Sequence, residues 1–194
     1  MGYKILSKRE LCPKKYGTVV CVAGGYGAAP CYLIAKAFKE AGNKVYMIMG
    51  ARSKELIFWQ DKMTQASSEL FITTNDGSLG IQGFVTEVLQ DLMNKEKINH
   101  VIAVGPMPMM KAVAEMTRAP KIPTTVSMNP IMVDGTGMCG ACRVTVGDEI
   151  KFACVDGPDF DGHLVDFDEV IQRTSIYKDM EKKRDENCNL LKQS

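Results

Sequence analysis

The sequence predicts an α/β fold with a five-stranded, doubly wound parallel sheet that has helices on both faces. A smaller C-terminal segment is predicted to hold a β-hairpin. Three observations predict this fold. Strand-like and helix-like apolar patterns alternate from residue 18 to residue 130, and glycine and cysteine crowd the chain after Pro130. The 194 residues, 45% of them hydrophobic, are enough for one medium domain with an appendage.

Five short apolar runs have the length and composition of buried strands. They are Thr18–Gly25, Lys44–Gly50, Glu69–Gly77, His100–Pro106 and Pro123–Asn129. The segments between them carry apolar residues at helical spacing. The predicted helices are Ala29–Gly42, Ser53–Gln65, Gly83–Glu96 (beginning near Gln82) and Pro108–Arg118. Strands that alternate with helices of this length form right-handed βαβ units, so the sheet is expected to be parallel and Rossmann-like.

The C-terminal part of the chain has a different pattern. Arg143–Cys154 predicts a hairpin that turns at Gly147 and Asp148, and a charged helix further on is expected to fray beyond Lys182. We therefore expect four parts. They are a lone strand-like piece (1–16), the α/β domain (17–130), a C-terminal segment (131–182) and a frayed tail (183–194).

Composition argues against several classes of protein. Lysine plus arginine number 24 and aspartate plus glutamate 23, so charge gives no reason to expect nucleic acid as a partner. The first ten residues hold no apolar signal region, and no run approaches the ~18 apolar residues of a membrane span. We expect a cytoplasmic protein without a membrane partner, whose seven cysteines are reduced.

A glycine-rich turn, AGGYGAAP, links the first predicted strand to the first helix. Gly24, Gly25 and Gly27 would permit a tight turn and a close backbone approach to a phosphate, and Pro30 suits a first helical turn. Pro30 replaces the last glycine of G-x-G-x-x-G, so the turn alone fits a plain structural role equally well.

The ends of the other strands favour the nucleotide interpretation. Asn75–Gly77, Gly105–Pro106 and Asn129–Pro130 follow the third, fourth and fifth strands, at the edge where open α/β sheets bind ligands. No acidic ribose contact follows the second strand. Arg52 stands there instead, either as a contact of a 2′-phosphate or as a solvated surface arginine, so NAD and NADP both remain open.

Four residues of the C-terminal segment have the spacing of a plant-type [2Fe–2S] site. Asp134, Cys139, Cys142 and Cys154 form D-x4-C-x2-C-x11-C, with a carboxylate in place of the first thiolate. The alternative is a structural zinc ion held by the three cysteines and either Asp134 or His163. Zinc sites usually pair two C-x2-C elements, and the single one here favours the iron–sulfur cluster.

Several motifs together resemble the ferredoxin-reductase superfamily. They are GGYGAAP, GARSKEL, TTNDGSLGIQG, VGPMPMMKAV and DGTGMCGAC. More closely, the chain resembles the electron-transfer subunits of dihydroorotate dehydrogenase and the small subunit of NADH-dependent reduced ferredoxin:NADP oxidoreductase, also named sulfide dehydrogenase. In the second branch an aspartate stands at the first cluster ligand, as Asp134 does here.

The resemblance implies nucleotide contacts from several strand ends. They are Gly24, Gly25 and Gly27 at the NAD pyrophosphate, Asp76 and Gly77 along the cleft, and Gly105, Pro106 and Met110 near the nicotinamide. The resemblance also implies FAD, because the family begins with a flavin-binding β-barrel. Residues 1–14 resemble the first strand of that barrel, but its flavin-binding arginine–serine/threonine motif is not found in this sequence.

The sequence therefore predicts an electron-transfer subunit of an NAD(P)H-dependent flavin and iron–sulfur oxidoreductase. It would bind NAD(H) and pass electrons through a [2Fe–2S] cluster to a larger flavin and iron–sulfur subunit in a heterodimer, with ferredoxin as a further candidate partner. We expect no activity without a flavin domain, and we assign no catalytic residue. The alternative is a non-enzymatic Rossmann-like module with a structural zinc loop.

Overall fold

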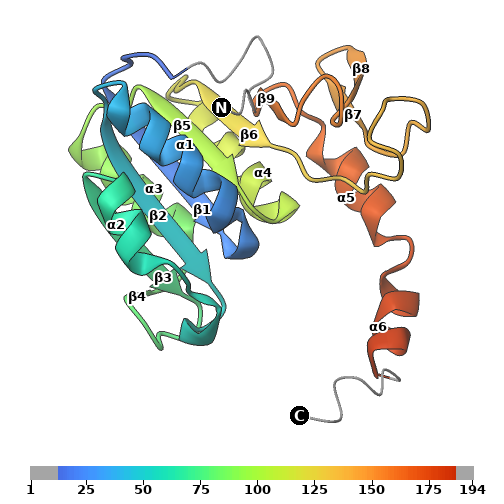
Figure 1. The fold of residues 1–194 in the computed structure, drawn as a ribbon, viewed down its shortest axis with the longest axis horizontal. Coiled ribbons are helices and arrows are strands. Elements are labelled where there is room, and N and C mark those ends of the chain that lie inside the picture. The colour runs from blue at the N-terminus through green and yellow to red at the C-terminus, as the bar shows by residue number, and fades with distance from the viewer. Residues whose placement is uncertain (1–12, 187–194) are drawn as a thin grey trace, which may run out of the picture.

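The computed structural model describes residues 13–186, which form a mostly parallel sheet with helices on both faces (Figure 1). The sheet has the order β4-β3-β2-β1-β5-β6-β9, and β7 and β8 form a separate hairpin. The strands are β1 Thr18–Gly24, β2 Lys44–Ala51, β3 Glu69–Thr74, β4 Ile81–Gln82, β5 His100–Val104, β6 Thr124–Ser127, β7 Arg143–Val146, β8 Glu149–Phe152 and β9 Asp159–Asp161. The helices are η1 Gly25–Gly27, α1 Ala28–Glu40, η2 Lys54–Leu56, α2 Gln60–Ala66, α3 Val85–Lys95, α4 Met107–Arg118, α5 Phe167–Ser175 and α6 Lys178–Glu186.

The α/β fold class and the five predicted strands are confirmed. These strands are β1, β2, β3, β5 and β6, which pair in parallel and are mostly buried, as strands covered on both faces should be. Two short strands extend the sheet at its edges. β4 adds two residues parallel to β3, and β9 adds three residues antiparallel to β6.

Two predicted helices differ from the structure. The segment Ser53–Gln65 is not one helix, because Trp59 has a left-handed backbone conformation with φ of 58° and separates η2 from α2. The next helix, α3, begins at Val85 rather than near Gln82. Gln82 pairs with β3 as part of β4, and Gly83 has a φ of 134° that a helix does not allow.

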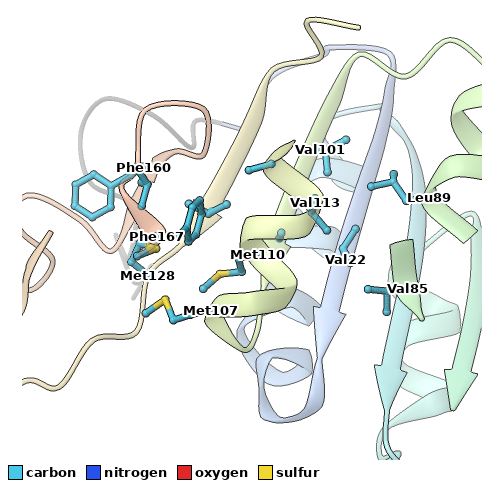
Figure 2. Packing of buried hydrophobic residues seen from close by; sticks show 14 of the residues in the cluster. Val22, Val85, Leu89, Val101, Met107, Met110, Val113, Met128, Phe160 and Phe167 are labelled. Atoms are coloured by element: carbon cyan, nitrogen blue, oxygen red, sulfur yellow. The ribbon is translucent and has the colours of Figure 1, made fainter. Parts of the chain in front are cut away.

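The core lies in two layers, one on each face of the sheet. On one face α1 and α2 bury Phe38 and Met63 against β1 and β2. On the other face α3 and α4 cover the sheet and α5 packs against α4. Figure 2 shows Met110 and Val113 of α4 among the buried side chains of this layer. Each fully buried side chain of this size contributes about 1.5–3 kcal/mol to folding.

The C-terminal segment is attached to the α/β domain by strand pairing and by side chains. β9 joins the sheet beside β6, and Lys111 Nζ of α4 lies 2.7 Å from Asp168 Oδ1 of α5. Thr145 Oγ1 of β7 donates to Glu169 at 2.6 Å, and Glu169 also pairs with Arg173 at 2.6 Å. These contacts fix the hairpin next to the sheet.

The two ends of the chain lie largely outside the described residues. Most of the piece predicted at 1–16 and the end of the predicted tail, residues 187–194, belong to that part. Within residues 13–186, α6 continues to Glu186, past the predicted fraying point at Lys182. None of the helices in this described range is long and apolar enough to cross a membrane.

Candidate functional site

A cleft of about 970 Å³ lies at the carboxyl edge of the parallel strands. The ends of β1, β2, β3, β5 and β6 all contribute to it, which is the edge that the sequence pattern indicated. Seven of the predicted nucleotide contacts line it: Gly24, Gly25, Gly27, Pro30, Arg52, Gly105 and Pro106. The cleft is large enough for a dinucleotide.

The glycine-rich turn lines the cleft, but its glycines have different roles. Gly25 has a φ of +53°, and a Cβ built there would meet nothing within 4 Å, so this position opens to the cleft. A Cβ on Gly27 would lie 2.2 Å from the carbonyl oxygen of Val104 in β5. Gly27 is therefore required by the packing of the turn against β5, whatever the ligand.

The nicotinamide contact predicted at Met110 requires correction. Met110 is fully buried, and Figure 2 shows it among the buried side chains beside α4. Its neighbour Met109 lines the cleft instead, and its sulfur would lie 2.6 Å from a Cβ on Gly24. Residues one apart on a helix point about 100° away from each other, so only one of two consecutive methionines can face the cleft.

Asp76 and Gly77, which were predicted to contact the nucleotide along the cleft, also lie outside the cleft lining. Asp76 accepts hydrogen bonds from the backbone N–H and the hydroxyl of Ser78 at 3.0 and 2.6 Å. These bonds hold the pKa of the Asp76 carboxyl below its usual range. Asp76 thus closes the turn after β3, and Asn75, one residue earlier, lines the cleft.

Several lining residues were missed by the sequence interpretation. They are mostly apolar and include Leu56, Phe84, Met109, Met128, Met132 and Pro158, with the hydroxyl-bearing Ser127 among them. Phe84 is 61% exposed. The sequence carried no signal for this wall of the cleft, because the predicted helix 83–96 included Phe84 and its exposure depends on the fold.

The predicted cluster loop, residues 131–142, is mostly exposed and holds Asp134, Cys139 and Cys142, whereas Cys154 follows β8. The four ligand candidates lie as two pairs. In the first pair, Asp134 Oδ2 accepts a hydrogen bond of 2.8 Å from the backbone N–H of Cys139. The other carboxylate oxygen accepts from Thr136 N–H at 2.8 Å. Together these N–H groups hold the pKa of Asp134 below its usual range, so the carboxylate is charged and fastens the loop.

The second pair consists of Cys142 and Cys154. Cys142 is buried and Cys154 is half-buried, whereas Cys139 is exposed. The neighbouring Cys142 thiol raises the pKa of Cys154, which means that the two sulfurs lie close together in the reduced loop. Cys154 also accepts a hydrogen bond from the backbone N–H of Gly137, which lowers the pKa of Cys154.

The donor set of this loop fits an iron–sulfur cluster. Asp134 and two of the thiols lie on the loop before β7, and the third thiol, Cys154, follows β8. Gly135, Gly137 and Gly140 have φ values of 74°, 85° and 66° that allow the loop to curl around a bound group. Within residues 13–186, no three histidine, cysteine, aspartate or glutamate side chains already lie close enough to hold a metal ion. His163, the alternative ligand, lies 3.0 Å from Thr117 Oγ1 instead.

The cleft and the cluster loop adjoin each other. Asn129, Pro130 and Met132 line the far end of the cleft, and Asp134 follows only two residues after Met132. Figure 1 shows this stretch leaving β6 and running toward the β7-β8 hairpin. A ligand that fills the cleft from the glycine-rich turn to β6 therefore ends next to the cluster loop.

Two protein families match these two regions. Residues 21–115 match the oxidoreductase NAD-binding domain, and residues 129–166 match the iron–sulfur cluster binding domain of dihydroorotate dehydrogenase B. The first range holds the glycine-rich turn, and the second holds all four cluster ligand candidates.

Two individual proteins with similar sequences are electron transfer subunits of the same kind. The chain is 49% identical over 169 residues to the dihydroorotate dehydrogenase B (NAD(+)) electron transfer subunit homolog of Thermotoga maritima, covering 87% of this chain and 60% of that one. It is 41% identical over 149 residues to the probable dihydroorotate dehydrogenase B (NAD(+)) electron transfer subunit of Methanocaldococcus jannaschii, covering 77% and 57%.

A solved structure extends the likeness to three dimensions. It belongs to NADH-dependent reduced ferredoxin-NADP oxidoreductase, an enzyme of flavin-based electron bifurcation. The TM-score is 0.81 at 47% sequence identity, with 90% of this chain and 63% of that chain covered. The chain therefore spans about three fifths of the length of these relatives.

Proposed function

The chain belongs to the oxidoreductases that join an NAD-binding domain to an iron–sulfur domain of the dihydroorotate dehydrogenase B type, and on this basis we propose that it is an electron-transfer subunit. It binds NAD(H) in the cleft and carries a [2Fe–2S] cluster between the loop after β6 and Cys154, which follows β8. The observation that carries the proposal is the adjacency of the two sites, with Met132 in the cleft wall and Asp134 in the cluster loop.

The nucleotide lies along the carboxyl edge in a defined direction. Its pyrophosphate meets the open position at Gly25 and the N-terminal end of α1, where backbone N–H groups favour an anion. The adenosine half extends toward Arg52 at the end of β2, and the nicotinamide half extends toward Pro106 and Ser127. This direction brings the reacting end of the cofactor next to the cluster loop.

Asp134, Cys139, Cys142 and Cys154 are the proposed cluster ligands. When bound, a [2Fe–2S] cluster supplies one-electron transfer, whereas NADH gives up two electrons as a hydride. A flavin is a group that can connect the two regimes, in agreement with the flavin-based electron bifurcation named for the similar structure. The chain's own residues position the nucleotide end and the cluster near each other.

A larger partner subunit would dock around the cluster loop. Apolar side chains are unusually exposed there: Val133 is 74%, Met138 is 89% and Ile150 is 66% exposed. Exposed apolar side chains that gather in one region mark protein interaction sites. A partner seated there would cover the loop and receive electrons over a short distance.

Metal and sulfide analysis of anaerobically purified protein tests the cluster assignment. We expect a reddish-brown protein with about two irons and two sulfides per chain. A colourless protein with one zinc ion per chain would contradict the proposal. The Asp134→Cys variant should keep its iron, because thiolate is the softer and preferred ligand, whereas Asp134→Ala should lose it on dilution in chelator.

NADH titration, followed by nucleotide fluorescence, tests the cleft assignment independently. Binding should weaken when the mouth of the cleft is filled by a Gly25→Ala substitution, and it should be unaffected by Gly147→Ala at the hairpin turn. Both glycines have positive φ and open surroundings, so the second variant controls for backbone strain. Equal affinities of the two variants would place the nucleotide elsewhere.

A further inference from the structure

A serine and a buried carboxyl group lie side by side at the edge of the cleft. Ser127 of β6 pairs with Asp159 of β9 in antiparallel register, so their side chains emerge on the same face of the sheet. Ser127 lines the cleft, and its register partner Asp159 is only 4% exposed. One oxygen of this carboxyl group, Oδ1, has no hydrogen-bond partner within the described chain.

The surroundings of Asp159 favour its neutral form. Burial raises the pKa of the Asp159 carboxyl, and a hydrogen bond with the Ser127 hydroxyl opposes this effect. The other titratable groups on this face of β5, β6 and β9 are Asp161, which is exposed, and His100, which contacts Thr125 Oγ1 at 3.0 Å. The positive charge of Lys14 also lies near His100 and lowers the pKa of its ring.

The cleft side adds no charge next to Asp159. Of the residues that line the cleft, Arg52 is the charged one, and it lies at the end of β2, three strands away from β6. Within the described residues, therefore, no cation compensates the burial of an ionised Asp159. A buried carboxyl group in such surroundings holds its proton to a higher pH than an exposed one.

We propose that Ser127 contacts the nicotinamide end of the bound dinucleotide and that Asp159 is a positioning residue that controls the direction of the Ser127 hydroxyl. This inference rests on the nucleotide site proposed above. A neutral Asp159 donates its proton to Ser127 Oγ, which leaves the Ser127 hydrogen free to donate to a ligand acceptor such as the carboxamide oxygen. An ionised Asp159 can only accept, so it takes the Ser127 hydrogen for itself.

The consequence is that nucleotide binding is coupled to a proton. The protonated form of Asp159 binds NADH more tightly, so the affinity falls as the pH rises through the pKa of this carboxyl group. By linkage, bound NADH raises that pKa further, and binding takes up a proton wherever free Asp159 is partly ionised. Losing one neutral hydrogen bond corresponds to a change in affinity of about 3- to 10-fold.

The experiment is a set of NADH titrations of the full 194-residue chain from about pH 5 to about pH 9. In the parent chain the affinity should fall about 3- to 10-fold with rising pH. Asp159→Asn should bind at all pH values as tightly as the parent does at low pH, because the amide also donates to Ser127. Ser127→Ala should bind weakly at all pH values, and Asp161→Asn, on the same face of β9, should keep the parent profile.

A measurement on the parent chain alone guards against a variant that fails to fold. Calorimetric heats of NADH binding in buffers of different ionisation enthalpy should show proton uptake in the range where the affinity changes. A pH profile that persists in Asp159→Asn, full affinity in Ser127→Ala, or zero proton uptake would each overturn this inference. A parent chain that binds no NADH at any pH would instead overturn the proposed nucleotide site.

Discussion

The nucleotide cleft and the cluster loop are neighbours, yet they are built in opposite ways. The cleft is formed by the ends of buried strands, and residues such as Val104 and Gly50 are fixed by pairing on both sides. The cluster loop is mostly exposed and depends on turns and on the two hydrogen bonds accepted by Asp134. The cleft is therefore formed before a nucleotide binds. The four side chains proposed to bind the cluster, in contrast, lie as two separate pairs.

This difference indicates where ligand binding contributes to structure. A preformed cleft binds its ligand with little reorganisation, so losing the ligand should leave the α/β domain intact. A loop whose donors have not converged gains its final geometry from the metal, as metal sites commonly do. The three predictions below test how firmly the α/β domain holds the cleft, from the largest expected effect to the smallest.

The largest effect is expected at Gly27, where the cleft depends on packing. Gly27→Ala would place a Cβ 2.2 Å from Val104 O, a backbone atom that cannot rotate away. We expect a loss of about 2–4 kcal/mol in the free energy of unfolding, measured by urea denaturation. Gly25→Ala should lose only about 1–2 kcal/mol through its positive φ, because the space beside it is open.

The sequence interpretation treated these two glycines alike, as contacts of the pyrophosphate. Equal losses of stability in the two variants would show that the turn is not packed against β5 as described. They would then remove the distinction between a glycine needed by the fold and one needed by the ligand.

An intermediate effect is expected from His100, which ties the stability of the α/β domain to pH. Its ring lies 4.9 Å from Tyr16 and 6.3 Å from Phe38, between centroids, and burial lowers its pKa from about 6.5 to about 4. The folded state therefore binds the proton more weakly than the unfolded state. The contribution of the neutral His100 ring to the free energy of unfolding is fully present above about pH 6.5. It is lost as the pH falls toward 4, by up to about 3 kcal/mol.

Urea denaturation between about pH 7 and about pH 4 measures this loss in the parent and in His100→Gln. The glutamine amide can still contact Thr125 but does not take up a proton, so the variant should show a shallower loss. His163→Gln is the matched control, because His163 is only half-buried. Parallel curves for the parent and His100→Gln would contradict the assignment.

The fold was predictable because its signals are local. Alternating strand and helix patterns are set by the sequence itself, so β1, β2, β3, β5 and β6 were found with their order along the chain. β9 was not found, because three residues beginning with a buried aspartate carry no strand pattern, and only pairing with β6 makes them a strand. The break at Trp59 likewise has no signal in a helical pattern.

The candidate site was predictable where it depends on strand ends, and not where it depends on side-chain direction. Gly24, Gly105 and Pro106 follow directly from the positions at which strands end. The choice between Met109 and Met110 depends on the rotation of α4 against the sheet, which tertiary packing decides. Ser127 and Asp159 could not be paired at all, because 31 residues separate them before β9 returns to the sheet.

The smallest effect is the most direct test of the central claim that a preformed cleft stands beside a loop organised by its metal. NADH affinity should be measured on the same preparation before and after the cluster is removed by chelation under anaerobic conditions. We predict dissociation constants that agree within about twofold, since the cleft residues are held by the sheet. Loss of NADH binding by about tenfold or more on cluster removal would show that the cleft depends on the cluster, and it would contradict the account.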